Sequence, residues 1–248
     1  PPAEQQPAFA FHHLPQPAAS TKELRSPDLV HGLVGVLHDV KLVEDDAAQK
    51  AHRFLLVAAR LLDSGQIDEA KSELGSIDVL FNNAGILVEG TIEKVSEEDW
   101  DRIMAVNVKG PYLVAKEVIP IMLKQKKGVI VNNASCSGLV GDRNAIAYNT
   151  SKGAVVLMTK CLALDYCGKN IRVNCVCPGE IETPMFRQEA AARKMPIDKY
   201  RKELCEYHPI GRLGQPVEVA NAVLFLASEE ASFITGTAFS VDGGYTCQ

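Results

Sequence analysis

The sequence lacks a long apolar run and an excess of positive charge. No apolar stretch approaches the roughly 18 residues that a membrane-spanning helix needs. The formal net charge is −5, and lysine and arginine are scattered along the chain. No basic face is therefore expected for a nucleic acid or an anionic membrane to bind. The beginning of the sequence also lacks the basic-then-apolar order of a secretory signal. We expect a cytoplasmic protein that binds neither nucleic acid nor membrane.

Cysteine shows no regular pattern. The seven cysteines are an odd number spread over a long chain, which favours reduced thiols over a disulfide framework. Cys175 and Cys177 are two residues apart, so they would share one face of a strand. We expect buried core thiols at these positions, because no second cluster of ligands accompanies the pair. The sequence predicts no metal site.

Glycine is absent from residues 1–20, which hold five prolines and only scattered apolar residues. This segment is typical of an irregular arm. We expect residues 21–248 to form a single domain, because 46% hydrophobic and 23% charged residues suit a globular chain of this length. The spacing of apolar residues predicts a helix over Ala47–Leu62, and residues 31–40 suit a short strand.

Beyond these residues, apolar strands alternate with longer helical stretches. Strands are predicted at 77–81, 128–132 and 171–177, and helices around 97–124 and 147–168. The alternation indicates an α/β protein with a Rossmann-like doubly wound parallel sheet, helices on both faces and an atypical N-terminal portion. Ligands of such sheets bind beyond the carboxyl ends of the strands. The residues that follow each strand are therefore the candidate site.

A tyrosine and a lysine follow the second of these strands at a spacing that matters for chemistry. Tyr148 and Lys152 are four residues apart, so on a helix they share one face. A phenol has a reference pKa of about 10, and a neighbouring ammonium favours its ionised form. The pair can therefore serve as a general acid/base for a hydroxyl or carbonyl oxygen. Taken alone, the same spacing also suits the exposed side of an amphipathic helix.

Seven blocks between about residues 73 and 244 resemble the short-chain dehydrogenase/reductase family in order and spacing. They include GSIDVLFNNAG, GVIVNNASCSGLVG, AYNTSKGAVVLMTKCLALDY, IRVNCVCPGEIETPM and FITGTAFSVDGG. The resemblance implies an enzyme that transfers a hydride between NAD or NADP and a secondary alcohol or ketone, with the hydride chemistry belonging to the cofactor. It also implies a homodimer or homotetramer formed through the helices around 97–124 and 147–168.

The resemblance implies a catalytic tetrad and a role for each member. Tyr148 would exchange the proton with the substrate oxygen, and Ser135 would hydrogen-bond that oxygen. Ser135 is preferred to Ser137, which falls where the family has a small residue. Lys152 would hold the nicotinamide ribose and lower the pKa of the tyrosine. Asn107 would kink its helix and anchor a water in a proton relay.

The cofactor-binding residues are also implied by the resemblance. Beyond strand 171–177, the Ile181 backbone and the Thr183 hydroxyl would meet the nicotinamide carboxamide. The full implied set is Asn82, Ala84, Gly85, Tyr148, Lys152, Ile181 and Thr183. Residues 185–209 would form helices over the substrate, although their mixed charge suits a solvated helical pair equally well.

The sequence departs from the family where the cofactor's pyrophosphate should bind. The family has a T-G-x-x-x-G-x-G turn, which would fall near residues 5–20, where glycine is absent. Two hypotheses remain open: an active oxidoreductase, or a non-catalytic member that acts as a binding or oligomer-forming subunit. The active hypothesis predicts that residues 1–74 place a strand beside 77–81 and present amides toward Tyr148. The choice between NAD and NADP stays open.

Overall fold

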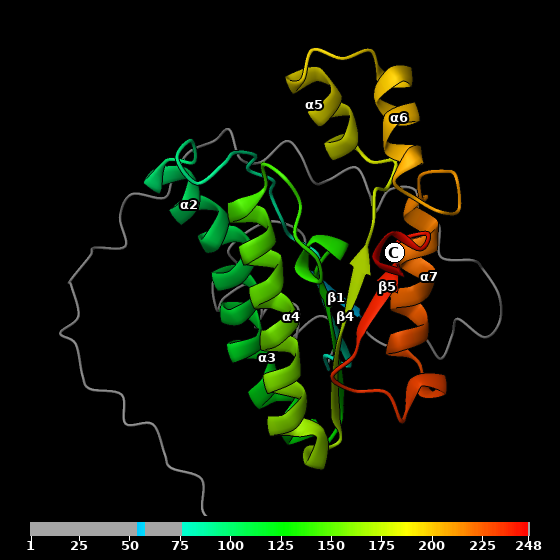
Figure 1. The fold of residues 1–248 in the computed structure, drawn as a ribbon. Helices are drawn as coiled ribbons and strands as arrows, with labels where there is room; N and C mark the ends of the chain where they lie inside the picture. Colours follow the sequence, from blue (N-terminus) through cyan, green and yellow to red (C-terminus); the bar gives the residue numbers. More distant parts are fainter. Residues whose placement is uncertain (1–53, 58–75, 248) are drawn as a thin grey trace, which may run out of the picture.

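The computed structural model describes residues 54–57 and 76–247, and its centre is a five-stranded parallel sheet (Figure 1). The strands lie in the sheet in their order along the chain: β1 Phe54–Val57, β2 Val79–Asn82, β3 Gly128–Asn133, β4 Ile171–Pro178 and β5 Ala238–Val241. Every neighbouring pair is parallel. All strands therefore present their carboxyl ends at one edge of the sheet.

Helices cover both faces of the sheet (Figure 1). On one face lie α3 (Gly110–Gln125) and α4 (Ile146–Tyr166). On the other lies α7 (Pro216–Ala227). Ile130 of β3 packs with α3, and the next residue, Val131, packs with α7, because successive strand side chains point to opposite faces. A strand buried on both faces must be apolar throughout, as the GVIV run is.

The helical stretch predicted around 97–124 is present, but it is broken in the middle. Helix α2 (Glu97–Met104) begins at Ser96, whose hydroxyl accepts a hydrogen bond from the Asp99 amide at 3.0 Å. A π-helical turn over Ala105–Lys109 then joins α2 to α3. Such a turn inserts an extra residue into the helix and redirects the side chains that follow it.

Two shorter helices stand beyond the carboxyl end of β4, at the top of Figure 1. They are α5 (Pro184–Ala192) and α6 (Ile197–Glu206). Their own apolar cluster includes Phe186 and Tyr200, whose rings stack with centroids 5.4 Å apart. Single helical turns complete the described elements: η5 Cys136–Gly138, η6 Cys167–Lys169, η7 Glu229–Ala231 and η8 Tyr245–Cys247.

The helix predicted over Ala47–Leu62 is wrong at Phe54–Val57, where the chain forms β1. Phe54 pairs with Val79 and Val57 with Asn82. A parallel strand at this position satisfies backbone groups that β2 would otherwise leave open at its edge, so tertiary pairing prevails over local periodicity. The expected strand beside 77–81 is thereby confirmed. The arm 1–20, the strand suggested at 31–40 and the amides expected near Tyr148 lie outside the described residues.

Cys175 and Cys177 are core thiols, as the sequence predicts. Both are fully buried on β4, in a cluster with Ala134, Val155 and Val156. Within residues 54–57 and 76–247, no helix combines the length and the apolarity that crossing a bilayer requires.

Candidate active site

The turn after β2, the π-helical turn and α4 converge at the carboxyl edge of the sheet. Gly85 shows how closely they approach, because a Cβ atom built on it would lie 3.3 Å from Lys152 Nζ and 3.6 Å from Asn107 Oδ1. A larger residue at position 85 would crowd both polar groups. The structure therefore brings together three residues that lie far apart in the sequence.

Asn107 fastens this arrangement with its side-chain amide. It lies in the π-helical turn and is buried. Its Oδ1 accepts a hydrogen bond from the Ile86 amide at 2.8 Å, and its Nδ2 donates to Ile86 O at 2.9 Å and to Ser151 Oγ at 3.0 Å. The amide thus joins the segment after β2 to α4, one residue before Lys152. The irregular turn agrees with the kink implied for Asn107, and the water relay stays a prediction.

Tyr148 and Lys152 share one face of α4. Lys152 Nζ lies 5.6 Å from the centroid of the Tyr148 ring and donates a hydrogen bond to Asn133 O at 2.8 Å. Lys152 is buried, and burial lowers the pKa of its ammonium to about 8. Burial also raises the pKa of Tyr148 well above its usual value. Since both groups lose hydration, the neutral phenol is the form present at neutral pH.

Ser135 lies two residues beyond the end of β3 and is buried. Its hydroxyl accepts a hydrogen bond from the Ser137 amide at 3.2 Å, which begins the turn η5. A hydrogen bond with Ser135 lowers the pKa of Tyr148 and partly opposes the effect of burial. The hydroxyl of Ser135 therefore lowers the pKa of Tyr148, whereas Ser137 contributes its backbone amide to the turn η5.

The Asn82 side chain points into the protein interior. It is buried, and its Nδ2 donates a hydrogen bond to Asn132 Oδ1 at 2.8 Å. Asn132 in turn donates to Thr159 Oγ1 at 2.9 Å, so the chain of amides ties β2 to β3 and α4. No partner for the buried Asn82 Oδ1 occurs among the described residues. Contact of Asn82, Ala84 and Gly85 with a cofactor stays a prediction.

Ile181 and Thr183 lie on the segment that joins β4 to α5. The Ile181 backbone forms a parallel bridge with Gly214. The Thr183 hydroxyl caps α5 by accepting a hydrogen bond from the Phe186 amide at 3.4 Å. The hydroxyl keeps its own proton free to donate. Their contact with a cofactor stays a prediction.

Glu180 and Glu189 influence the pKa of Tyr148, although sequence reasoning did not single them out. The Glu180 amide donates to His208 Nε2 at 3.1 Å, while His208 Nδ1 lies 3.0 Å from Leu204 O. Burial raises the pKa of Glu180 to about 7, with a further increase from the charge of Glu189. Both carboxylates raise the pKa of Tyr148. The position of Glu180 directly after a strand and a Pro-Gly pair was the available signal.

The end of α5 contacts the segment after β2, which favours the hypothesis that residues 185–209 cover the substrate. Arg193, next to the last residue of α5, forms an ion pair with Glu89. Its guanidinium also lies 5.0 Å from the centroid of the Tyr200 ring. Tyr200 donates a hydrogen bond from its hydroxyl to Glu189 at 2.8 Å. The pair of helices is therefore packed internally and connected across the carboxyl edge.

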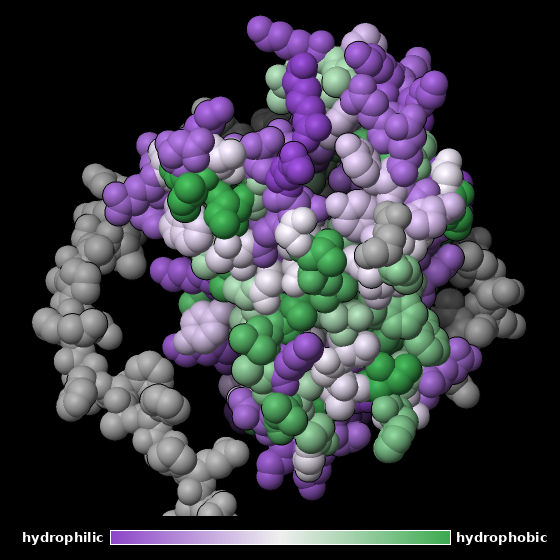
Figure 2. Space-filling model, viewed as in Figure 1, coloured by the Kyte–Doolittle hydropathy of each residue, from purple (hydrophilic) through white to green (hydrophobic). Residues whose placement is uncertain are grey.

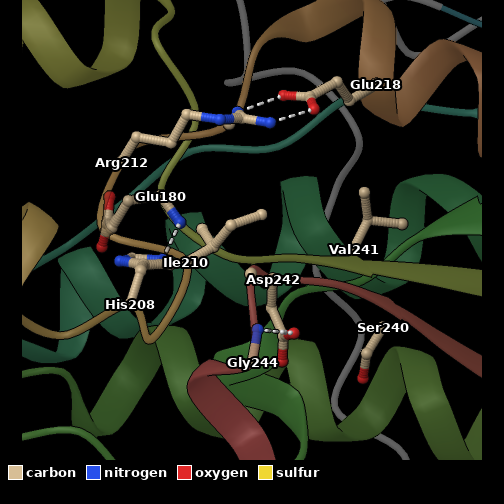
Figure 3. Close-up of a pocket in the computed structure, with 11 residues that line it drawn as sticks. Glu180, His208, Ile210, Arg212, Glu218, Ser240, Val241, Asp242 and Gly244 are labelled. Atoms are coloured by element: carbon tan, nitrogen blue, oxygen red, sulfur yellow. Dashed lines mark hydrogen bonds and ion pairs between the residues drawn. The ribbon is translucent and has the colours of Figure 1, made fainter.

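A cavity of about 290 Å³ opens beside Glu180, between the ends of β4 and β5 (Figure 3). Arg212 and Glu218 close one side of it through two hydrogen bonds of 2.8 and 2.7 Å, which Figure 3 shows above Glu180. Its lining is mostly polar or backbone: Glu180, His208, Ile210, Arg212, Gly214, Glu218, Ser240, Val241, Asp242, Gly243 and Gly244. Among the described residues, no three potential metal ligands come together.

A parallel α/β sheet with a half-buried tyrosine, a buried lysine and a buried serine at its carboxyl edge defines a Rossmann-like oxidoreductase. Comparison with known proteins narrows this class. Residues 64–246 match a family model described as enoyl-(acyl carrier protein) reductase. The chain is 44% identical over 180 residues to 2-(S)-hydroxypropyl-CoM dehydrogenase 3 of Xanthobacter autotrophicus, covering 73% of this chain and 70% of that protein.

Two solved structures agree with this match. Ligand-free aldohexose dehydrogenase of Thermoplasma acidophilum is 46% identical with a TM-score of 0.72, over 75% of this chain and 74% of that one. ElxO with NADP bound is 33% identical with a TM-score of 0.70, over 77% of each chain. The chain belongs to the short-chain dehydrogenase/reductase family and is an oxidoreductase that uses NAD or NADP.

Proposed function

We propose that this protein interconverts a secondary alcohol and a ketone, with Tyr148 as the general acid/base. The observation that carries the proposal is the convergence of Tyr148, Ser135 and Lys152 at the carboxyl edge of the sheet. Relatives that are named a hydroxypropyl-CoM dehydrogenase and an aldohexose dehydrogenase support an alcohol or carbonyl substrate.

The residues at this edge fit the nicotinamide end of a dinucleotide. Gly85 keeps the space next to Lys152 Nζ open, because a side chain at position 85 would place its Cβ atom 3.3 Å from Nζ. The Lys152 ammonium donates one of its three N–H groups to Asn133 O, so its two other N–H groups can donate to ribose hydroxyls. The Gly85 and Ile181 backbones and the Thr183 hydroxyl are the further groups that would hold the cofactor. When bound, NAD or NADP supplies or takes up the hydride.

Proton transfer is the part of the reaction that the chain's own residues perform. In the reducing direction, the Tyr148 phenol donates its proton to the carbonyl oxygen, and the Ser135 hydroxyl donates a hydrogen bond to the same oxygen. The Lys152 ammonium stabilises the phenolate that results. Because burial keeps Tyr148 protonated, the free site is prepared for carbonyl reduction. Alcohol oxidation uses the same groups in reverse.

The second hypothesis, a non-catalytic family member, rests on the missing glycine-rich turn. Strand β1 weighs against it, because β1 supplies a parallel neighbour for β2 without that motif. Cofactor binding measured by calorimetry separates the two hypotheses. Millimolar NAD and NADP without a binding signal would favour a binding or oligomer-forming subunit.

Replacement of Tyr148 by phenylalanine tests the proposed role of the phenol. The variant keeps the ring and loses the proton donor, so we expect kcat for ketone reduction to fall by about 10²- to 10⁴-fold. The affinity for NAD or NADP should change little. A Tyr112→Phe variant, altered at an exposed tyrosine of α3, serves as the control. A Tyr148→Phe enzyme with wild-type kcat would contradict the proposed role.

We also propose a homodimer or homotetramer in the cytoplasm. Figure 2 shows apolar side chains gathered over the region of α4, and Leu157 and Leu164 of this helix are 62% and 79% exposed. Large exposed apolar side chains on one helix favour burial against a second subunit. The free cysteines of the described residues support a reducing compartment. Cell fractionation that recovers the protein outside the cytoplasm would contradict the proposed location.

A further inference from the structure

The loop that joins the catalytic serine to the catalytic tyrosine is held near both ends, where η5 packs on α4 and the Gly90 amide donates a hydrogen bond to Asn144 O. It runs from Ser135 to Tyr148, and its middle stretch, residues 139–144, is exposed at every position except Asp142. Asp142 is half-buried, so it is the inward anchor of that stretch. Whatever holds Asp142 therefore holds the middle of the loop between Ser135 and Tyr148.

The segment that follows β5 supplies this hold. The Tyr245 hydroxyl donates a hydrogen bond to Asp142 Oδ1 at 2.6 Å. The other carboxylate oxygen, Oδ2, lies 3.4 Å from the Nδ2 atom of Asn149, the residue after the catalytic tyrosine. Asn149 Nδ2 also donates to Val140 O at 2.9 Å. Asp142 thus connects Tyr245 to the first turn of α4.

Tyr245 is itself held firmly. The Asp242 carboxylate is buried and accepts hydrogen bonds from the Gly244 and Thr246 amides, both at 3.0 Å. Gly243 and Gly244 have φ values of 58° and 89°, which fold the segment into a tight turn. The centroid of the Tyr245 ring lies 5.5 Å from that of the His208 ring. His208 accepts a hydrogen bond from the Glu180 amide.

We propose that Tyr245 is a positioning residue of the active site: its hydroxyl fixes Asp142 and, through it, the loop that sets Ser135 against Tyr148. This inference rests on the function proposed above for Ser135 and Tyr148. Tyr245 does not touch the reacting atoms in this scheme. Tyr245 lies 103 positions after Asp142 in the sequence, so it acts from a distant segment of the chain.

The variant Tyr245→Phe removes the hydroxyl and keeps the ring beside His208. We expect kcat to fall by about ten-fold, because small misplacements of catalytic groups have large effects on rate. The Kd for NAD or NADP and the melting temperature should stay near their wild-type values. Tyr112→Phe is the matched control. Unchanged kcat, or a fall in kcat accompanied by equal losses in cofactor affinity and melting temperature, would overturn the proposal.

A double-mutant cycle with Asp142→Ala tests the route of the effect. If Tyr245 acts through Asp142, the double variant loses no more kcat than the stronger single variant. Multiplied losses would show that Tyr245 acts elsewhere and would overturn the inference.

Hydrogen exchange separates this proposal from the proposed function. The amides of residues 139–144 should exchange faster in Tyr245→Phe than in the wild type, whether or not the protein turns over a substrate. Unchanged exchange there would refute the anchoring by Tyr245 even in an active enzyme. Faster exchange in a protein without dehydrogenase activity would leave the anchoring in place and refute the catalytic assignment on which its role depends.

Discussion

Burial governs the protonation of Tyr148 and Lys152. Burial raises the pKa of the Tyr148 phenol and lowers the pKa of the Lys152 ammonium to about 8. Both shifts favour the neutral form of the group. The spacing of Tyr148 and Lys152 in the sequence predicts only the attraction between ammonium and phenolate. The structure adds desolvation, and also Glu180 and Glu189, whose charges oppose a phenolate. These groups lie on segments that only the fold brings to Tyr148.

Glu180 should shape the pH dependence of alcohol oxidation. Its pKa is about 7, so above neutral pH it is ionised and raises the pKa of Tyr148. Oxidation needs Tyr148 as a phenolate, which accepts the proton of the alcohol, and the charge of Glu180 favours the protonated phenol instead. In Glu180→Gln that charge is absent, so the oxidation profile should reach half-maximal kcat/KM at a pH lower by about one unit. Below pH 6 the two enzymes should behave alike.

The control for this prediction is Glu182→Gln, two residues away. Glu182 pairs with Arg201 at 2.6 Å, and this guanidinium lowers the pKa of Glu182. Its charge is therefore constant across the range tested. A profile of Glu180→Gln that superimposes on the wild type would contradict the assigned influence of Glu180 on the phenol.

The elements that carry the site meet through close backbone contacts. The turn η5, which follows Ser135, packs directly on α4. A Cβ atom built on Gly138 would lie 2.8 Å from Lys152 O and 3.2 Å from the Gly153 amide nitrogen. Backbone atoms within a helix cannot move aside separately, so this position admits only glycine without displacing the serine loop from the helix.

The variant Gly138→Ala should therefore lower both stability and turnover. We expect about 1–3 kcal/mol of lost unfolding free energy, the range typical of overpacking, measured by urea denaturation. The rate should fall as well, because Ser135 moves with the turn. Gly141→Ala in the same loop is the control, since nothing lies within 4 Å of a Cβ there. Equal stability of the two variants would contradict the close packing of η5 on α4.

At the scale of the whole molecule, the exposed face of α4 predicts assembly. Replacement of Leu157 and Leu164 by glutamate should convert the proposed dimer or tetramer into smaller species, because charges at a buried apolar interface are unfavourable. Light scattering coupled to size exclusion gives the mass. Ile92→Glu, at another strongly exposed apolar side chain, should leave the mass unchanged. A wild-type protein of monomeric mass would refute the assembly itself.

Local pattern was sufficient for much of the fold. Strands β2, β3 and β4 lie within about two residues of their predicted bounds, because parallel strands buried on both faces must be continuously apolar. Tyr148 and Lys152 could be paired from spacing alone, since a helix repeats its face every four residues. The resemblance to a family then named Ser135 and Asn107, which spacing by itself did not distinguish from loop and helix residues.

Other features depend on contacts that no local pattern records. Strand β1 forms within a stretch of helical periodicity because β2 has an open edge beside it. The Asn82 side chain turns inward because its amide donates a hydrogen bond to Asn132, whose own amide donates to Thr159. Glu180, Glu189 and Tyr245 reach the active site from distant segments. The sequence by itself determined strands β2, β3 and β4, the helix face and the family. Only the tertiary structure decided the protonation and positioning of the site, because both depend on burial and on neighbours brought together by folding.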